Sequence, residues 1–542
     1  MATGFAHYLD SKLLLSLDLE KLPLLKAQFI AKDHARRHIL LCDLMEQSAD
    51  QWPQKSFLES PQTKYTFQQA DLFMNQVAHW GLSINLKSGD IVALLMRNRP
   101  EYILLWLGLG KIGVVTAFIN IRLKKPGLLQ SFRVIQPSIL IIDTEIADTM
   151  LERIDTSFSG PIHTFSPPSS PSDHTSNSLH GMPTTRPNRS IRSGITTSDT
   201  ALLIFTSGTT GLPKATRVTH FQSLLRGIRF HLFMQVNAFD RIFTCLPLYH
   251  TAGGVLTPIL AILSGAAIII FPGFSSDIWT HIRSTKSTIL QYIGEMCCYL
   301  MDASPSLLDA ENQLRAAFGN GLPRRIWSEF QSRYRIPIIY EFYGSTESPI
   351  GLLNRCASSL EQGHLGRRGM LDVAFSGTRL LRYDFQQNSL FRHPITGAYQ
   401  SCHVDEIGEL VVLLHPSNMC RRFEGYYNDP NASQLKLLHN VFLPGDMYFR
   451  TGDLFRVDRK HCWHFIDRIG DTFRWKGENV STAFVREILT SFSDFREICV
   501  YGVEIPCVSG KCCMIAVVLH PHRDTIDIDA LSVFRNSIDV DI

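Results

Sequence analysis

The sequence lacks the features by which several large protein classes are told apart. Its 542 residues carry 53 Lys and Arg against 50 Asp and Glu, and a net charge of +3 gives no field that would indicate nucleic-acid binding. The twelve cysteines form no C-x-x-C pair, so neither a zinc ribbon nor a disulfide framework is indicated. Scattered thiols in so long a chain predict a reduced, intracellular protein.

The sequence also shows no targeting signal at either end and no clear membrane span. No secretory signal opens the sequence and no peroxisomal Ser-Lys-Leu closes it. The longest stretch without Asp, Glu, Lys or Arg is 242–276, but Pro258 and Ser264-Gly265 interrupt it. Its apolar part is at the short limit for a bilayer span. We therefore predict a buried helix, turn and strand in that stretch.

The first 40 residues are predicted to form an amphipathic segment. Leucines between positions 13 and 25 precede a basic run, Lys32 to His38. An apolar stretch beside basic residues suits the interface of a membrane, and it suits packing onto the body of the protein equally well. Both readings stay open, and the first predicts peripheral membrane contact through residues 13–38.

The composition is that of a large folded protein, with 45% hydrophobic and 19% charged residues. Strand-like runs at 91–95, 138–143, 202–205 and 338–340 alternate with helical patterns, which predicts an α/β architecture with buried sheets. We predict a main domain over 41–466 and a small module over 467–542. Residues 157–198, rich in Ser and Pro between 166 and 178, are predicted to be a mobile surface insertion ahead of a core strand.

One loop has the composition of a phosphate site. A buried strand, 202–205, runs into Thr206, Ser207, Gly208, Thr209, Thr210 and Gly211, and Lys214 closes the loop. Glycine lets the backbone approach an anion closely, the hydroxyls add donors, and the lysine adds a point charge. Pro213 stands where a Walker loop has its second glycine. A turn rich in Gly and Thr is usually only a turn, but this density of donors favours phosphate binding.

Three further segments carry chemistry. The strand at 338–340 leads to Gly344, a hydroxyl pair and Glu347, a carboxylate suited to a magnesium ion that bridges nucleotide phosphates. Tyr343 is placed to stack on a base, although an aromatic residue at a strand end also suits plain core. Asp453 and Arg468 fit the hydroxyls of a ribose, and each alone also fits a surface turn.

In this order the four segments resemble the signatures of the adenylate-forming superfamily of acyl-CoA synthetases, adenylation domains and luciferases. Further stretches are similar to the fatty acid transport protein and very long-chain acyl-CoA synthetase family: 106–115, 291–295, 319–322, 342–347 and 470–482. The resemblance covers about residues 35 to 520, apart from 157–198.

The resemblance implies a large N-terminal domain of stacked α/β subdomains with a small β subdomain, followed by a small, truncated C-terminal α+β domain. It implies an ATP-dependent ligase that uses Mg²⁺ and CoA. A fatty carboxylate attacks the α-phosphate of ATP to give acyl-AMP and pyrophosphate, and the CoA thiol then displaces AMP. The reaction can be coupled to fatty acid uptake. A membrane-associated location at the endoplasmic reticulum, the peroxisome or a lipid droplet is expected.

Residue roles follow from the resemblance, position by position. Residues 206–214 would hold the β- and γ-phosphates, and Thr346 would lie beside the α-phosphate. Glu347 would bind magnesium, and Asp453 and Arg468 would grip the ribose. The adenine would be lined by Gly319, Asn320, Gly321, Glu341, Phe342, Tyr343, Gly344 and Ser345. The catalytic set implied in this way is Lys214, His250, Thr346 and Glu347.

The remaining assignments concern the acyl group and the hinge. His250 matches a position near the acyl carboxylate, although a lone histidine is more often a core residue. Gly470 falls where the superfamily hinges its small domain between the two half-reactions. The acyl pocket would include Tyr292, Ile293, Gly294 and Glu295.

The sequence departs from the family pattern at three places. Phe484 stands where an acidic residue is usual, and 511–514 replaces a small, Gly-containing segment. The sequence given ends at Ile542, before the stretch whose lysine reaches the α-phosphate, which leads us to expect slowed adenylation. Two alternatives stay open: a non-catalytic fatty acid or nucleotide-binding protein, and an acyl-AMP ligase that supplies a biosynthetic pathway.

Overall fold

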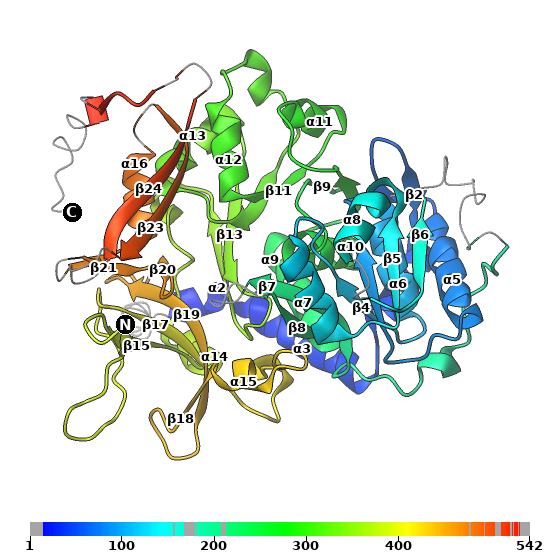
Figure 1. Cartoon of the computed structure of the whole chain (residues 1–542), viewed down its shortest axis with the longest axis horizontal. Coiled ribbons are helices and arrows are strands. Elements are labelled where there is room, and N and C mark those ends of the chain that lie inside the picture. The colour runs from blue at the N-terminus through cyan, green and yellow to red at the C-terminus, as the bar shows by residue number, and fades with distance from the viewer. Residues whose placement is uncertain are drawn as a thin grey trace, which may run out of the picture.

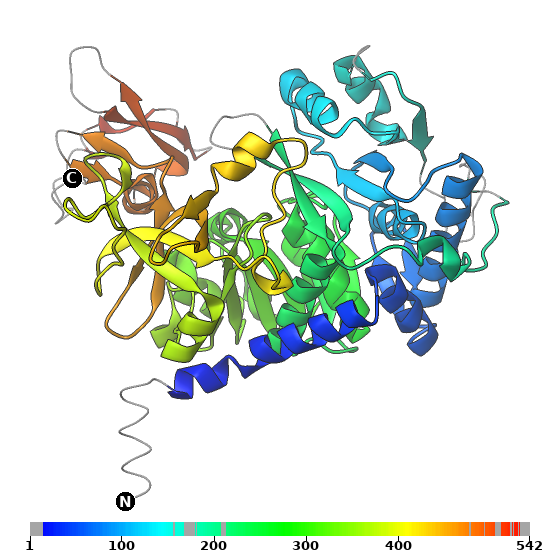
Figure 2. The same cartoon turned by 90° about the horizontal axis from the view of Figure 1, so that it is seen from below.

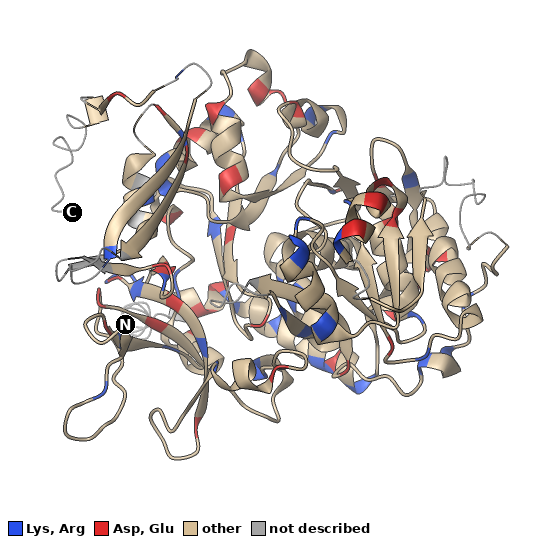
Figure 3. Cartoon of the chain, viewed as in Figure 1, with Lys and Arg blue, Asp and Glu red and all other residues tan. Residues whose placement is uncertain are grey.

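The computed structural model contains three sheets and a small C-terminal module (Figure 1). It describes residues 15–154, 158–166, 179, 181–207, 213–475, 478–490, 492, 494–504, 511–520, 523, 525–528 and 530–531. Basic and acidic residues are interspersed over the elements and gather on no single one of them in this view (Figure 3).

The first sheet has six strands in the order β6-β5-β3-β4-β7-β8. Their bounds are β3 (Ile91–Leu95), β4 (Val115–Phe118), β5 (Ile139–Asp143), β6 (Ile162–Phe165), β7 (Thr200–Ser207) and β8 (Pro213–Thr219). All neighbours are parallel except β7 and β8, which form an antiparallel hairpin. The inner strands are buried on both faces, which explains why they read as continuous apolar runs.

The second sheet has eight strands in the order β14-β13-β12-β11-β9-β10-β1-β2. Their bounds are β1 (Ser56–Glu59), β2 (Lys64–Thr66), β9 (Arg241–Thr244), β10 (Ala267–Ile270), β11 (Ile289–Ile293), β12 (Ala316–Asn320), β13 (Ile339–Gly344) and β14 (Gly351–Cys356). The predicted α/β architecture is therefore confirmed.

One continuous core fills the space between the two sheets. It takes side chains from both sheets and from the helices α4 (Leu41–Gln51), α5 (Phe67–Ser83), α6 (Pro100–Gly110), α9 (His220–Met234) and α10 (Thr257–Ser264). Helices α7 (Lys125–Ile135) and α8 (Ala147–Ile154) share a core with the outer face of the first sheet. Helices α11 (Ile278–Ser284), α12 (Gly294–Asp302) and α13 (Arg324–Arg333) do the same for the second.

The 242–276 stretch forms part of that core, as predicted. Its segments are β9, α10 and β10, and their apolar side chains are buried. Gly265 ends α10 at a φ of 73°, and a Cβ there would lie 2.7 Å from the ring of Trp52. Among the residues that the structure describes, no helix has both the length and the apolar character needed to cross a bilayer.

The third sheet is antiparallel and is followed by the small module. Its strands are β15 (Thr378–Asp384), β16 (Ser389–Leu390), β17 (Ile407–Leu413), β18 (Leu437–His439), β19 (Met447–Val457) and β20 (Trp463–Arg468). The module contains β21 (Phe473–Trp475), β22 (Glu478–Val480), α16 (Thr482–Leu489), β23 (Phe495–Glu504) and β24 (Lys511–Leu519). Strand β21 pairs with β22, and β23 with β24.

The N-terminal helices lie along one side of the body (Figure 2). They are α2 (Leu15–Glu20) and α3 (Leu22–Arg36), and Ala27 and Ala31 are fully buried where α3 packs on α9. The carboxylate of Asp18 accepts hydrogen bonds from the N–H groups of residues 371 and 372 and so caps α14 (Met370–Ser376). One face of α3 therefore packs onto the body of the protein, while Phe29 on the other face is 74% exposed.

The parts of 157–198 that the structure describes are paired with the body of the protein. Strand β6 joins the first sheet. Arg192 is buried, and its Nη2 donates to Asp43 and Glu46 at 2.8 and 2.7 Å, while Arg186 pairs with two further carboxylates of α4 and α5. Ion pairs to residues far earlier in the chain fix this segment, and Ser and Pro content does not reveal them. Residues 167–178, where Ser and Pro are densest, lie outside the described part.

Candidate functional site

The hairpin of β7 and β8 forms one wall of the site. Thr206 and Lys214 are cross-strand partners, which places a hydroxyl and an ammonium group side by side at the loop end of the hairpin. The predicted loop residues Gly208, Thr209, Thr210 and Gly211 lie outside the described residues, and of Ser207 only the backbone is described.

Lys214 and Glu347 come from different sheets and meet at Tyr426. The Lys214 ammonium lies 5.6 Å from the centroid of the Tyr426 ring, a cation–π distance. The Tyr426 hydroxyl donates to Oε1 of Glu347 at 3.2 Å. Among the described residues Lys214 has no carboxylate partner, so its charge is available to an anion.

Glu347 fits a metal ligand on the evidence of its own environment. Its Oε2 is buried and has no hydrogen-bond partner among the described residues. An unpaired carboxylate oxygen is costly to bury, and a hard divalent cation satisfies it. The residues present therefore fit a magnesium ion at Glu347.

Backbone and hydroxyl contacts hold Thr346 beside Glu347. The Thr346 hydroxyl lies 2.8 Å from that of Thr251, and its carbonyl accepts a hydrogen bond from Nη2 of Arg226 at 2.6 Å. Burial lowers the pKa of Arg226 to about 10, with the nearby charge of Glu347 acting in the opposite direction. The guanidinium stays charged at neutral pH and adds positive potential to this corner.

Asp453 and Arg468 are brought together as predicted. They are cross-strand partners on β19 and β20, with Nε of Arg468 3.7 Å from Oδ1 of Asp453. The Tyr343 hydroxyl donates to Oδ2 of Asp453 at 2.5 Å, which joins the end of β13 to the third sheet. Burial raises the pKa of Asp453, with Tyr343 and Arg468 opposing the rise. The carboxylate is thus oriented by two neighbours and keeps acceptor capacity for hydroxyl groups.

The carboxyl group of Glu341 supports the turn after β12 through hydrogen bonds. Its Oε1 accepts hydrogen bonds from the N–H groups of Gly321 and Leu322, and its Oε2 accepts one from the Tyr292 hydroxyl. Glu341 was predicted to line the adenine, but its side chain is 5% exposed and directed to these partners. Asn320 and Gly344 are exposed at the ends of their strands, where a base can reach them.

The four residues assigned to an acyl pocket do not share one surface. Tyr292 and Gly294 are buried, and a Cβ at Gly294 would lie 1.7 Å from the carbonyl oxygen of Gly321. Ile293 and Glu295 are exposed. Tyr292 and Ile293 end β11, where neighbouring side chains point to opposite faces, and Gly294 and Glu295 begin α12, where they lie at different angles about the helix axis.

His250 and Gly470 lie at the edges of the site. His250 is exposed beside Tyr249, and partial desolvation and the charge of Arg122 lower its pKa, so the ring is neutral at pH 7. Gly470 is exposed in the turn between β20 and β21, where the N–H of Asp471 donates to the carbonyl of Arg468. An exposed turn of this kind can accommodate the change in backbone angles that a hinge requires.

Tyr426, Arg226 and Thr251 were missed by the analysis of the sequence. Tyr426 stands in a Gly-Tyr-Tyr-Asn-Asp-Pro turn, and the aromatic pair in a polar turn was the one available signal. Arg226 is inside a helix and gives no signal. Thr251 directly follows the singled-out His250, but a lone hydroxyl carries no pattern.

Comparison with known proteins gives concordant matches. The family model described as AMP-binding enzyme matches residues 45–381. Long-chain fatty acid transport protein 6 of Mus musculus is 34% identical over 486 residues, which are 88% of this chain and 77% of that protein. Long-chain fatty acid transport protein 2 of Rattus norvegicus is 34% identical over 481 residues, 87% of this chain and 76% of the relative.

Solved structures share the fold at lower identity. The anthranilate CoA ligase AuaEII in complex with anthranoyl-AMP superposes with a TM-score of 0.74 at 20% identity, over 92% of this chain and 90% of that one. ATP-bound MatB from Rhodopseudomonas palustris gives 0.73 at 19% identity, over 92% of both chains.

Proposed function

The chain belongs to the AMP-binding enzyme family, within its group of long-chain and very long-chain fatty acid transport proteins, and from this premise we propose that it is an ATP-dependent fatty acid–CoA ligase acting through acyl-AMP. One observation carries the proposal: Lys214 and Glu347 meet at Tyr426, and within the described part of the chain the lysine has no carboxylate partner and Oε2 of Glu347 has no hydrogen-bond partner. Lys214 would be the cation, and Glu347 the metal ligand, that binding of a nucleoside triphosphate with magnesium requires.

The protein contributes little covalent chemistry to this reaction. In the first half, a carboxylate oxygen of the fatty acid forms a bond to the α-phosphorus while the bond to pyrophosphate breaks. In the second, the thiol sulfur of CoA bonds to the acyl carbon, AMP leaves and the thiol proton goes to solvent. The task is to bring two anions together and offset their repulsion.

The residues divide this task. Lys214 neutralises phosphate charge, and Arg226 fixes the backbone at Thr346 so that this hydroxyl faces the α-phosphate. Bound at Glu347, magnesium would neutralise further phosphate charge. Asp453 and Arg468 hold the ribose, and neutral His250 lies at the entrance for the acyl carboxylate. The turn at Gly470 serves as the hinge between residues 41–466 and the module that follows.

Calorimetry with Mg-ATP tests the site. Lys214→Ala and Glu347→Gln should each lower the affinity by about tenfold or more, since charge-assisted hydrogen bonds are worth about 1.5–3 kcal/mol. Lys87→Ala and Glu329→Gln are matched controls because both residues are exposed and lie outside the site. Unchanged affinity in both site variants would defeat the assignment.

Two activity assays separate the alternatives. Exchange of labelled pyrophosphate into ATP, across fatty acids of medium to very long chain, reports adenylation. A binding protein gives no exchange although it binds ATP. An acyl-AMP ligase gives exchange but forms no acyl-CoA when CoA is added.

Membrane contact is proposed at a surface formed by α2, α3 and α14. Asp18 holds α2 against α14, and the exposed apolar side chains there are Leu19, Leu22, Phe29, Met370, Leu371 and Phe375. A patch of this kind on a protein that handles fatty acids suits a lipid surface.

Vesicle flotation tests this surface. Leu19→Glu with Phe375→Glu should reduce binding to phosphatidylcholine vesicles at least severalfold, because charge is placed where apolar side chains would enter the bilayer. Leu307→Glu with Ile395→Glu is the control, since both of those side chains are at least 90% exposed elsewhere. Equal binding by both double variants would place the contact on another surface or exclude it.

A further inference from the structure

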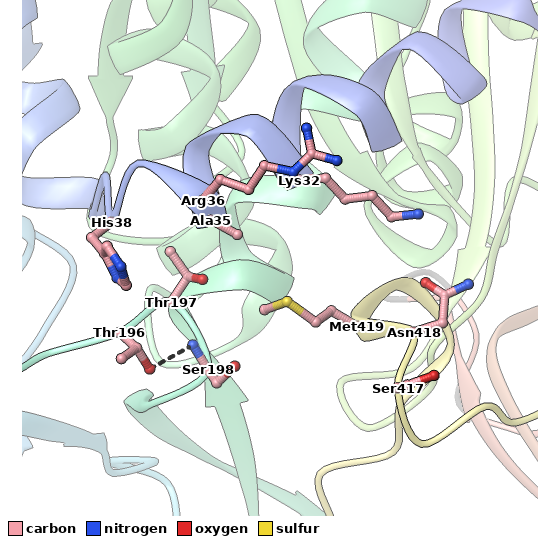
Figure 4. Close-up of a pocket in the computed structure, with 10 residues that line it drawn as sticks. All are labelled: Lys32, Ala35, Arg36, His38, Thr196, Thr197, Ser198, Ser417, Asn418 and Met419. Atoms are coloured by element: carbon pink, nitrogen blue, oxygen red, sulfur yellow. Dashed lines mark hydrogen bonds between the residues drawn. The ribbon is translucent and has the colours of Figure 1, made fainter.

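A cavity of about 670 Å³ opens beside the C-terminal end of α3 (Figure 4). Its walls come from that helix end, from the turn that precedes β7, and from the segment leading into the short helix η7 (Met419–Arg421). The lining residues are Lys32, Ala35, Arg36, His38, Thr196, Thr197, Ser198, Ser417, Asn418 and Met419. None of them belongs to the nucleotide site, and the volume is in the range of small-molecule sites.

One wall of the cavity carries two basic side chains that have no ion-pair partner among the described residues. Lys32 and Arg36 lie one helical turn apart, and neither has an ion pair or hydrogen bond to its side chain within the described ranges. The adjacent carboxylate, Asp33, is engaged elsewhere, because it pairs with Arg37 at 3.5 Å. Like charges four residues apart repel, so an anion between them relieves a cost that the free protein carries.

The opposite wall supplies neutral donors. Three consecutive hydroxyl residues, 196–198, face the helix across the cavity, and Lys32 extends toward Asn418 (Figure 4). Oδ1 of Asn418 accepts the N–H of Cys420 at 3.1 Å, which fixes the amide and leaves its NH₂ group for a ligand. No Asp or Glu is among the lining residues, and Asp199, which follows Ser198, accepts hydrogen bonds from the N–H and the hydroxyl of Thr196.

We propose that this cavity binds the phosphomonoester group of a ligand. A phosphomonoester is close to a dianion at neutral pH, which matches the two fixed charges of Lys32 and Arg36. Its three terminal oxygens can accept hydrogen bonds from the hydroxyls of Thr197 and Ser198 and from the Asn418 amide, while the Thr196 hydroxyl donates to Asp199. The proposal does not depend on the ligase activity, because it uses none of the residues assigned to the nucleotide.

This chemistry has two possible sources, and the test separates them. Glycerol 3-phosphate is the soluble probe, and phosphatidylcholine vesicles with and without phosphatidic acid present the same group on a membrane. The full chain is first saturated with Mg-ATP, so that the nucleotide site is filled. Calorimetry then follows glycerol 3-phosphate, and flotation follows the vesicles.

A pair of double variants makes the test specific. Lys32→Gln with Arg36→Gln removes two charges that line the cavity, and Lys26→Gln with Lys87→Gln removes two exposed charges that do not. Loss of about tenfold or more in affinity for either probe, in the first variant alone, supports the proposal and identifies the source. Unchanged Mg-ATP affinity shows that both variants are folded. Absence of binding to both probes, or equal loss in the two variants, would overturn it.

Discussion

Replacing Glu341 by glutamine should remove a pH dependence of stability from this protein. Burial raises the pKa of the Glu341 carboxyl from 4.5 to about 8, although the N–H groups of Gly321 and Leu322 and the hydroxyl of Tyr292 oppose the rise. Desolvation is the larger effect, so the group is mostly protonated in the folded chain at neutral pH, and the O–H at Oε2 then donates to the Tyr292 oxygen. In the unfolded chain it ionises near its ordinary value.

The sign and the size follow from linkage. Between pH 4.5 and 8 the folded chain binds more protons at this position than the unfolded chain does, so the free energy of unfolding falls as the pH rises. The contribution is fully present below pH 4.5 and is lost as the pH passes 8. At about 1.4 kcal/mol per pKa unit, the whole change is about 5 kcal/mol. Other carboxylates add their own dependence, but it is common to wild type and variant.

Glutamine is the informative substitution because it keeps the contacts and cannot ionise. Its oxygen can accept from Gly321 and Leu322, and its NH₂ group can donate to the Tyr292 oxygen. Urea unfolding of wild type and Glu341→Gln, measured from pH 5 to 9, should show the variant gaining relative stability steadily until about pH 8. Glu329→Gln, at an exposed position, should run parallel to wild type. Parallel profiles for Glu341→Gln as well would refute the reasoning.

Three other substitutions probe single contacts. Gly294→Ala puts a Cβ 1.7 Å from a carbonyl oxygen and should destabilise by about 1–3 kcal/mol and weaken ATP, whereas Gly110→Ala, with nothing within 4 Å, should be neutral in both assays. Arg192→Met leaves two buried carboxylates without this partner and should lower the urea midpoint by the equivalent of about 3–5 kcal/mol. Arg189→Met, an exposed arginine beside it, should cost less than about 1 kcal/mol, and equal losses would contradict the burial argument. Asp453→Ala should weaken ATP and AMP by similar factors in calorimetry because both carry the same sugar, and an effect on ATP alone would place Asp453 at the phosphates.

The sequence predicts best where a pattern is local. Strands such as 91–95 and 267–270 are continuous apolar runs because both of their faces are buried, and the run alone identifies them. Lys214 and Glu347 were found because each follows such a strand. Their roles at the nucleotide stay predictions, but their convergence is observed.

Contacts across long distances in the chain were not predictable in this way. Tyr426 is 79 residues from Glu347, and no periodicity relates them. Arg192 is 149 residues from Asp43, and a segment that looked like an insertion is fixed by that pair. Glu341 was assigned to the adenine from the family resemblance, and its contacts with Gly321, Leu322 and Tyr292 could not be predicted from the sequence.

The docking of the N-terminal helix has a consequence for the order of events during synthesis. Asp18 caps a helix whose first turn lies 354 residues later. At the usual rate of about 5–20 residues per second, the ribosome needs roughly 20 to 70 seconds to add that partner. For most of that interval α2 has left the exit tunnel while α14 does not yet exist. The contact between α2 and α14 therefore forms late, after α3 can already pack on α9, and in the meantime Leu17 of α2 is open to chaperones or to a membrane surface.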